Sequence, residues 1–363
     1  MPENIDDEQR SAAAPSEPAT GAPATLESVA RAAGVSLATA SRSLNGSNRT
    51  VNESYRARVL EAAARLNYSP NTSAQAVARG STMTVALVVA DVADPYFSSI
   101  AAGVVAAARD DGLIVTMTAT DGDPERELQI VRTLRGQRPK VIILASSRRT
   151  NAQTAPLLQR ELEDYERSGG RVVLISRNEL GFRTVYIDNV AGGQALAGRL
   201  ISLGYRSFAV LAGDHELHTA DDRYRGFERG LALAGVRIDE SHVVRGAFTR
   251  DGGYDGMRAL LAKGVAGVGA ARIDAVFAVN DVMAVGALTA LREAGLVPGR
   301  DIAVAGFDDI PTVQDTWPTL TTVRVPLVEV GLTALRLALT DVVGDEPAIG
   351  VEVMVRDSTP GAE

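Results

Sequence analysis

Residues 25–80 contain seven arginines and three glutamates, and they contain no lysine or aspartate. This segment is basic although the whole chain carries a formal net charge of −8. Guanidinium groups attract the phosphates of nucleic acids whatever the base sequence, and a local basic patch is sufficient for that attraction. A solvated helix face would explain the same arginines equally well, so the elements that carry them must decide between the two interpretations.

The sequence TLESVARAAGVSLATASRSLNG, which begins at Thr25, predicts two short helices on either side of a turn at residues 34–36. Thr25 and Ser36 have short hydroxyl side chains that can accept hydrogen bonds from the free N–H groups of a first helical turn. Apolar side chains lie on one face of the first helix, at Leu26, Val29, Ala30 and Ala33. Two helices around a tight turn form a helix-turn-helix, whose second helix can lie in the major groove of DNA. The helix pair therefore favours DNA binding as the explanation of the charge.

A third helix is predicted from Glu53 to Leu66, with Asn52 as its N-cap. We expect it to close a small core through Val59, Leu60 and Ala63. Pro70 follows, and proline excludes the helical conformation from the residue before it. The alanine-rich residues 71–80 are too short to be stable as an isolated helix, so we expect a hinge that folds only when it docks.

From residue 84 onward, short apolar runs alternate with amphipathic stretches. Strands are predicted at residues 84–92, 113–119, 141–146, 171–176, 207–213, 242–247, 275–280 and 302–307. Helices are predicted at residues 96–110, 125–136, 156–168, 190–203, 221–234, 251–263 and 281–294. This alternation indicates parallel sheets covered by helices on both faces, in two similar α/β halves. Because ligands of such sheets bind beyond the carboxyl ends of the strands, we expect a site in a cleft between the halves.

The sequence offers little for catalysis or metal binding. It has no cysteine and three histidines, and the pair in DHELH at residues 214–218 does not have the H-E-x-x-H spacing of zinc proteases. It contains no phosphate-binding loop, nucleophile elbow or dinucleotide-binding glycine motif. We therefore expect no enzyme activity, no cofactor and no metal.

The composition also argues against a membrane-spanning protein and a secreted protein. No apolar run approaches the ~18–20 residues of a membrane span. Residues 1–24 lack the basic and apolar regions of a signal peptide; they are acidic and rich in Ala, Pro and Ser, which predicts a disordered leader. We expect a cytoplasmic protein with no membrane partner.

The sequence resembles the lactose/galactose-repressor (LacI/GalR) family of bacterial transcription regulators. The resemblance covers residues 25 to about 356 and rests on the order and spacing of VARAAGVSLATASRSLNG, ARLNYSPN, ADPYFSSIAAGV, VYIDNVAGG, LISLGYRSFAVLAG, DRYRGFERGL, FAVNDVMAVGAL and VAGFDD. It implies a helix-turn-helix headpiece, a hinge helix and a two-lobed core similar to periplasmic sugar-binding proteins. It also implies a homodimer on double-stranded DNA with a pseudo-palindromic operator, and a small effector between the lobes.

This resemblance sets the expected domain boundaries. The leader comprises residues 1–24, the headpiece 25–70 and the hinge helix 71–80. The core is expected to form two parallel-sheet α/β subdomains, of which the first comprises residues 84–187 with 324–341 and the second 188–323 with 345–356.

The resemblance also places the DNA contacts. Leu37, Ala38 and Arg42 occupy the positions that meet base edges, where an arginine can donate two hydrogen bonds to guanine. Thr39 and Ser41 suit phosphate oxygens. Ala40 and Ser43 stand where the family usually has larger apolar residues, which predicts a looser headpiece core.

The hinge is expected to contact the minor groove through Asn71, Ala74, Val77 and Ala78. Val77 replaces the usual leucine, and its shorter side chain should unstack the bases less. A plain linker over residues 71–80 is the alternative interpretation.

In the core, Tyr96 and Phe97 follow the first strand and could stack on a sugar or purine ring, although core packing explains Phe97 equally well. Phe248 resembles the cleft aromatic residue of the second lobe, and Arg223 resembles the arginine that binds ligand hydroxyls or a carboxylate. A surface ion pair of Arg223 with a neighbouring aspartate, Asp221 or Asp222, is the alternative.

Asn280 and Asp308 end strands and could bind vicinal hydroxyls, and one of Asp308 and Asp309 could instead orient the loop. Arg177 ends another strand and is expected in the effector site. It follows Ser176, where the family often has an aspartate, and this departure weakens the assignment of a specific sugar.

We therefore predict a ligand-responsive transcription factor, a repressor, with a sugar or polyol as effector. Three alternatives stay open. They are a sugar-sensing binding protein without specific operator recognition, a nucleoside- or purine-responsive regulator, and an α/β enzyme whose catalytic set is not visible in the sequence.

Overall fold

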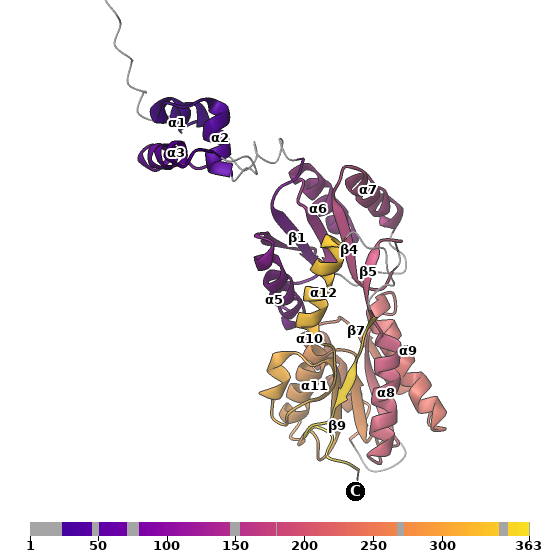
Figure 1. Ribbon diagram of the computed structural model, residues 1–363. Coiled ribbons are helices and arrows are strands. Elements are labelled where there is room, and N and C mark those ends of the chain that lie inside the picture. Colours follow the sequence, from indigo (N-terminus) through magenta and orange to yellow (C-terminus); the bar gives the residue numbers. More distant parts are fainter. Residues whose placement is uncertain are drawn as a thin grey trace, which may run out of the picture. The chain divides into compact units, whose positions relative to one another are not determined.

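The computed structural model describes residues 24–45, 51–70, 80–145, 153–178, 180–266, 272–340 and 348–362, without the side chains of Asn45 and Ser176. The chain forms two compact units, Met1–Ala78 and Arg79–Glu363 (Figure 1). Residues 1–23 of the expected leader and residues 71–79 of the expected hinge lie outside the described residues.

The first unit is a headpiece of three helices, α1 (Leu26–Ala33), α2 (Leu37–Asn45) and α3 (Glu53–Arg65). The predicted caps are confirmed, because the Thr25 side chain accepts from the Ser28 N–H and Asn52 Oδ1 accepts from the Ser54 N–H at 3.0 Å. Ser36 Oγ likewise accepts from the Thr39 N–H at 3.1 Å. Each short polar side chain therefore satisfies backbone donors that a helix start leaves without partners.

The headpiece core is small and consists of Val29, Ala30, Ala33, Ala40, Val59, Ala62 and Ala63. The expectation for Leu60 is wrong, because its side chain is 48% exposed. Residues 59, 62, 63 and 66 follow the i, i+3, i+4, i+7 spacing of one helix face, and Leu60 is turned about 100° away from it. Ser43 is buried, and its hydroxyl donates to the Thr39 carbonyl at 2.8 Å, so the small core holds no unsatisfied hydroxyl there.

The second unit contains two six-stranded sheets. The first sheet has the order β11-β5-β4-β3-β1-β2, and all its strand pairs are parallel. Its strands are β1 (Thr84–Val89), β2 (Ile114–Ala119), β3 (Val141–Ala145), β4 (Arg171–Ser176), β5 (Arg183–Ile187) and β11 (Ala348–Ile349). Its helices are α5 (Pro95–Asp110), α6 (Pro124–Gln137), α7 (Ala155–Arg167) and α12 (Leu327–Leu339).

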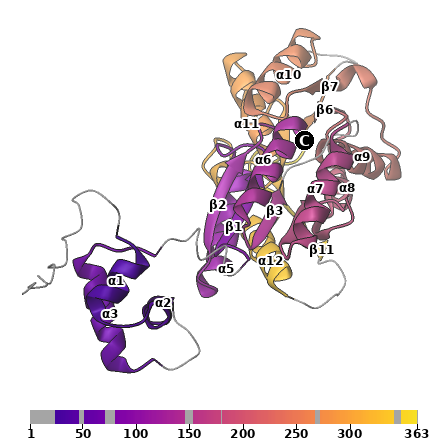
Figure 2. The ribbon, with the colours of Figure 1, turned by 90° about the horizontal axis from the view of Figure 1, so that it is seen from above.

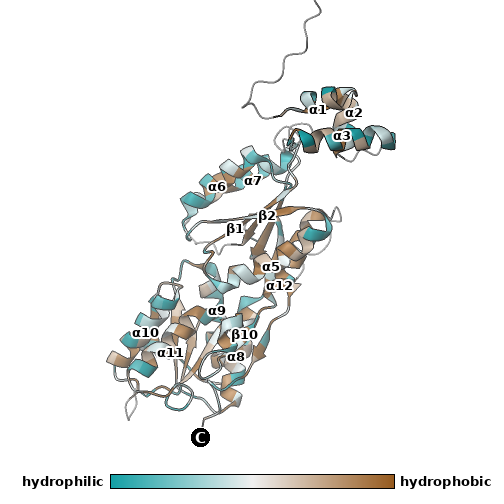
Figure 3. Ribbon diagram, turned by 90° about the vertical axis from the view of Figure 1, so that its left-hand side faces the viewer, coloured by the Kyte–Doolittle hydropathy of each residue, from teal (hydrophilic) through white to brown (hydrophobic). Residues whose placement is uncertain are grey.

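Helices cover both faces of this sheet, which is why its central strands β1 and β3 are apolar and almost fully buried, whereas the edge strand β2 is largely exposed. Alternate residues of β1 pack on opposite sides: Val85, Leu87 and Val89 join the cluster with α5 and α12. Ala86 and Val88 join the cluster with α6 and α7. Figures 1 and 2 show these helices beside the strands of the first sheet. Figure 3 shows the hydrophilic residues of α6 and α7 in teal.

The second sheet has the order β12-β10-β9-β8-β6-β7, and only β12 runs antiparallel to its neighbour among the described strands. Its strands are β6 (Phe208–Gly213), β7 (Val243–Gly246), β8 (Ala275–Ala278), β9 (Ala303–Asp308), β10 (Thr321–Arg324) and β12 (Glu352–Met354). Its helices are α8 (Asn189–Ser202), α9 (His218–Leu233), α10 (Arg250–Ala262) and α11 (Asp281–Glu293). Two parallel-sheet α/β lobes are therefore present, as predicted.

The chain crosses between the lobes after β5, after β10 and between β11 and β12. After β10, α12 returns to the first lobe and packs against α5, where Gly103 and Gly331 allow close contact: a Cβ on Gly103 would lie 2.0 Å from the Val328 carbonyl oxygen. β11 pairs with β5 and so belongs to the first sheet, whereas residues 345–356 were all expected in the second lobe. A strand of two residues carries no periodicity that a sequence pattern can show.

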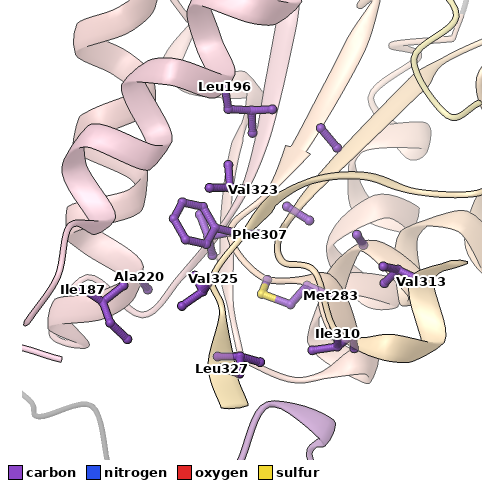
Figure 4. Packing of buried hydrophobic residues seen from close by; sticks show 14 of the residues in the cluster. Ile187, Leu196, Ala220, Met283, Phe307, Ile310, Val313, Val323, Val325 and Leu327 are labelled. Carbon is purple, nitrogen blue, oxygen red and sulfur yellow. The ribbon is translucent and has the colours of Figure 1, made fainter. Parts of the chain in front are cut away.

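Phe307 of β9 lies in the core of the second lobe near Leu196, Val323 and Val325 (Figure 4). Gly192 of α8 leaves room for its ring, because a Cβ there would lie 2.6 Å from the Phe307 Cζ. The ring is thus fixed at the end of β9, next to the aspartate that follows it.

No helix in the described part of the chain has both the length and the apolar character needed to cross a membrane.

Candidate DNA-binding and effector sites

Helix α2 presents its first turn to solvent. Leu37 is 51% exposed, and Ala38 and Arg42 are also exposed, whereas Ala40 and Ser43 face the headpiece core. Thr39 is half-buried, and its hydroxyl shares a 2.9 Å hydrogen bond with the Ser36 hydroxyl. The side chains predicted to meet base edges therefore lie on the outer face of the helix.

The arginines of the headpiece have different roles. Arg58 donates to the carbonyls of Ala33 and Gly34, where α1 ends, so it holds the turn between α1 and α2. Arg31 forms an exposed pair with Glu27 at 3.4 Å. Arg42 makes no ion pair with any described residue, and its guanidinium remains available to DNA. The predicted hinge contacts Asn71, Ala74, Val77 and Ala78 lie outside the described residues.

In the second unit, a cavity of about 980 Å³ lies where the carboxyl ends of strands from both lobes meet. Six of the predicted effector residues line it: Tyr96, Phe97, Arg223, Phe248, Asn280 and Asp308. Arg177 is not among its lining residues. The Arg177 side chain is half exposed and lies 3.6 Å from Asp222 of α9, although Ile175 near the end of the same strand lines the cavity.

Arg223 is the most constrained polar group of the cavity. Its side chain is 1% exposed, Nε donates to Asn189 Oδ1 at 2.9 Å, and Nη1 donates to the Val279 carbonyl at 2.9 Å. Nη1 and Nη2 also donate to the two Asp308 carboxylate oxygens, at 3.2 and 2.6 Å. The guanidinium carbon lies 4.0 Å from the centroid of the Phe307 ring, a cation–π contact.

The alternative of a surface ion pair for Arg223 is wrong. Asp221 pairs with Arg225 at 2.8 Å, and Asp222 lies next to Arg177. The periodicity of α9 explains the difference, since Arg223 lies on its buried face with Gly226 and Phe227.

Asp308 has an unusual backbone, with φ of 122°, and Asp309 follows with φ of 56°. Asp309 is buried between two arginines, accepting from Arg324 Nε at 2.7 Å and from Arg356 Nη2 at 2.6 Å. These contacts hold the bend that directs Asp308 toward Arg223. Burial raises the pKa of the Asp308 carboxyl, and the Arg223 guanidinium opposes this rise.

The neighbouring Asp281 is fully buried at the start of α11. It accepts from the Thr322 hydroxyl at 2.6 Å and from the Ile310 N–H at 2.9 Å. Burial raises its pKa to about 6, although these hydrogen bonds favour the ionised form.

The side-chain amide of Asn280 already forms hydrogen bonds within the protein. Its Oδ1 accepts from the Met283 N–H at 2.9 Å and caps α11, and Nδ2 faces the Phe248 carbonyl at 3.4 Å. Tyr96 and Phe97 meet edge to face with centroids 5.0 Å apart, and Phe97 is buried in the core cluster. Tyr96 and Phe248 are therefore the better-placed aromatic surfaces for a ligand ring.

The sequence reasoning missed several charged side chains of the cavity. These are Asp91, Asp94, Asp121, Asp214, His215, Arg245, Arg250 and Asp251. Asp91, Asp121 and Asp214 each follow the carboxyl end of a strand, so the same rule that selected Asp308 could have found them. Across the described ranges, no group of three or more His, Cys, Asp or Glu side chains is arranged to hold a metal ion.

Two known families match the chain. Residues 25–71 match the bacterial regulatory proteins of the lacI family, and residues 197–359 match a periplasmic binding protein-like domain.

Similar proteins span nearly the full length. The transcriptional regulator GalS of Salmonella typhimurium is 35% identical, over 88% of this chain and 90% of that protein. CelR of Thermobifida fusca is 33% identical, over 92% and 98%. The ribose operon repressor of Escherichia coli is 32% identical, over 86% and 91%.

Solved structures agree. The lac repressor dimer bound to operator and the anti-inducer ONPF has a TM-score of 0.78 at 25% identity, covering 93% of this chain and 99% of that chain. A complex of CelR with cellobiose has a TM-score of 0.64 at 31% identity, covering 92% and 99%. With the helix-turn-helix, the two-lobed core and these relatives together, the chain belongs to the lacI family of bacterial regulatory proteins and is a DNA-binding transcriptional regulator.

Proposed function

We propose that this regulator is a cytoplasmic repressor that binds a pseudo-palindromic operator as a homodimer, and that a sugar or polyol in the cavity controls its affinity for that operator. The observation that carries the proposal is the buried Arg223–Asp308 pair at the base of a cavity lined by strand ends of both lobes. CelR, a relative of similar length, is known in complex with cellobiose.

The cavity chemistry suits a hydroxyl-rich ring. Tyr96 and Phe248 offer aromatic faces to its apolar C–H surface. Asp308 has lone pairs beyond those used by Arg223 and can accept from a hydroxyl, while Arg223 keeps one Nη2 N–H that can donate to the same hydroxyl. A few fixed polar groups in a largely apolar cleft are typical of small-molecule sites.

Coupling to DNA follows from the position of the ligand. A molecule that contacts residues of both lobes favours the arrangement in which both sets of contacts form, and it shifts the population by its difference in affinity for the two arrangements. On the DNA side, we infer that Leu37, Ala38 and Arg42 read bases, and that Thr39 and Ser41 position the helix on phosphates. The effector is bound and released unchanged, so the protein acts as a sensor and not as an enzyme.

A binding experiment tests the proposal. Fluorescence anisotropy measures binding of the purified chain to a labelled DNA fragment from upstream of its own gene, with and without a panel of sugars, polyols and nucleosides. We expect binding that weakens steeply with salt, and a change in Kd with at least one sugar or polyol. Failure to bind any such fragment under all these conditions would reject the proposal, and a response confined to nucleosides would reassign the effector.

A further inference from the structure

We infer that the cavity selects an uncharged, unphosphorylated polyhydroxyl ligand and excludes sugar phosphates, sugar acids and nucleotides. This inference rests on the proposed effector-binding function and specifies its ligand class. It depends on three features of the cavity. The guanidinium N–H groups of Arg223 already donate to protein acceptors, the lining contains more carboxylates than cations, and the helices that begin at the cavity are capped by their own side chains.

The first feature is the occupied guanidinium. Proteins bind carboxylates and phosphates most strongly through two parallel N–H groups of one arginine. Both terminal nitrogens of Arg223 already donate to Asp308, Nε donates to Asn189, and Nη1 also donates to the Val279 carbonyl. One N–H remains, which serves a hydroxyl but cannot form the paired contact with an anion.

The second feature is the charge of the lining, which contains six aspartates and three arginines. Besides Arg223, the arginines also have partners: Arg250 Nη1 lies 2.8 Å from the Asp251 carboxylate, and Arg245 lies over the Tyr224 ring at 5.1 Å. An anion that enters the cavity therefore meets an excess of negative charge. A neutral sugar enters the same cavity but carries no charge for these carboxylates to repel.

The third feature concerns backbone N–H groups, which bind anions where a helix begins. Helices α5, α10 and α11 start with the cavity residues Asp94, Thr249 and Asn280, and the side chain of each accepts from an N–H of the first turn. One first-turn N–H of each of these helices is thus already satisfied by its cap. Helix α9 starts after Leu217, and the carboxylates of Asp214 and Glu216 precede its start, which disfavours an anion there. Asp221 and Asp222, which follow, are paired with Arg225 and Arg177.

Isothermal titration calorimetry of the full chain with matched pairs tests the inference. The pairs are glucose and glucose 6-phosphate, galactose and galactose 1-phosphate, ribose and ribose 5-phosphate, and glucose and glucuronate, with cellobiose and glycerol as further neutral ligands. For any neutral sugar that binds, we expect the charged partner to bind at least about tenfold more weakly at low salt, as a like charge within a few ångströms of several carboxylates requires.

A pair of variants on α10 provides the matched control. Asp251→Asn removes a carboxylate of the lining and releases Arg250, and should narrow the preference for the neutral sugar several-fold. Asp255→Asn makes the same change on the same helix, but Asp255 does not line this cavity, and it should leave the preference unchanged.

The outcomes separate the inference from the function on which it rests. A charged partner that binds as tightly as its neutral sugar, or more tightly, would overturn the inference and leave the effector function intact. If no compound binds and none alters DNA binding, the effector function itself fails, and the inference fails with it.

Discussion

The outer face of α2 and the floor of the cavity satisfy their polar groups in opposite ways. Arg42 is exposed and makes no ion pair among the described residues, so its charge is available to a partner. Arg223 is buried and already holds a carboxylate, an amide and a carbonyl. We therefore expect binding to DNA to form new charge contacts, which weaken as the salt concentration rises. In the effector site the polar groups are already fixed by one another, so we expect it to accept only ligands whose shape and charge fit that arrangement.

Removal of Arg223 should produce the largest effect. Arg223→Ala leaves Asp308 buried without its cation, so we expect about 3 kcal/mol less free energy of unfolding at pH 7 and loss of the effector response. Chemical denaturation and calorimetry with the neutral sugar measure the two effects. Arg225→Ala, on the exposed face of the same helix, should change either by little. If the variant binds the effector as tightly as the unaltered protein does, Arg223 is not part of the effector site.

Removal of Arg42 should weaken DNA binding and leave effector binding unchanged. We expect Arg42→Ala to cost ~1–3 kcal/mol in operator binding and little on random DNA, because only a base contact distinguishes the two. Anisotropy titrations on both fragments measure this difference. Arg31→Ala, which removes an arginine paired with Glu27, serves as the control. Equal losses on operator and random DNA would show that Arg42 contacts phosphate only.

Asp281 should make stability depend on pH. Its pKa is raised to about 6 in the folded chain and is 3.8 ordinarily, so the folded state binds more protons between these values. The free energy of unfolding should therefore fall as pH rises through this window, by roughly 1–3 kcal/mol from this group. Asp281→Asn should flatten this part of the pH profile, since an amide can still accept from Ile310 and donate to the Thr322 hydroxyl. The free energy of unfolding is measured by urea denaturation at a series of pH values. If its dependence on pH is the same in Asp281→Asn as in the unaltered protein, the assignment to Asp281 is wrong.

Gly34 should have the smallest effect of the four. Its φ of 63° is left-handed, and an added Cβ would lie 2.6 Å from Arg58 Nη2. We expect Gly34→Ala to destabilise the headpiece by ~1–2 kcal/mol and to weaken operator binding, with no change in effector affinity. Gly136→Ala is the control, because Gly136 is helical and an added Cβ would meet no other atom within 4 Å. A headpiece as stable as the original in thermal unfolding would show that the turn can adapt.

The sequence predicted those parts of the fold that repeat a strong local signal. Thr25 and Asn52 were identified as caps from their residue type and position. The alternation of apolar runs and helices also predicted both lobes. Strands β5, β10, β11 and β12 were not predicted as strands, because β11 has two residues and the other three mix polar with apolar residues and so lack a continuous apolar run.

The candidate site was predicted in part. Residues that follow strands, such as Tyr96 and Asp308, line the cavity because topology alone brings strand ends together. The pairing of Arg223 with Asp308 joins positions 85 residues apart, and no local pattern indicates that separation. A position after a strand is not sufficient, however, because Arg177 follows β4 and its side chain contacts Asp222 instead of lining the cavity.

The most direct test of the account is the operator affinity of the full chain at fixed salt, measured by anisotropy with and without a saturating neutral sugar identified by calorimetry. We expect the sugar to change Kd by about fivefold or more in the unaltered protein, and to leave the Kd of Arg223→Ala unchanged. A sugar that binds the cavity while operator affinity stays the same would contradict the claim that the cavity controls the headpiece.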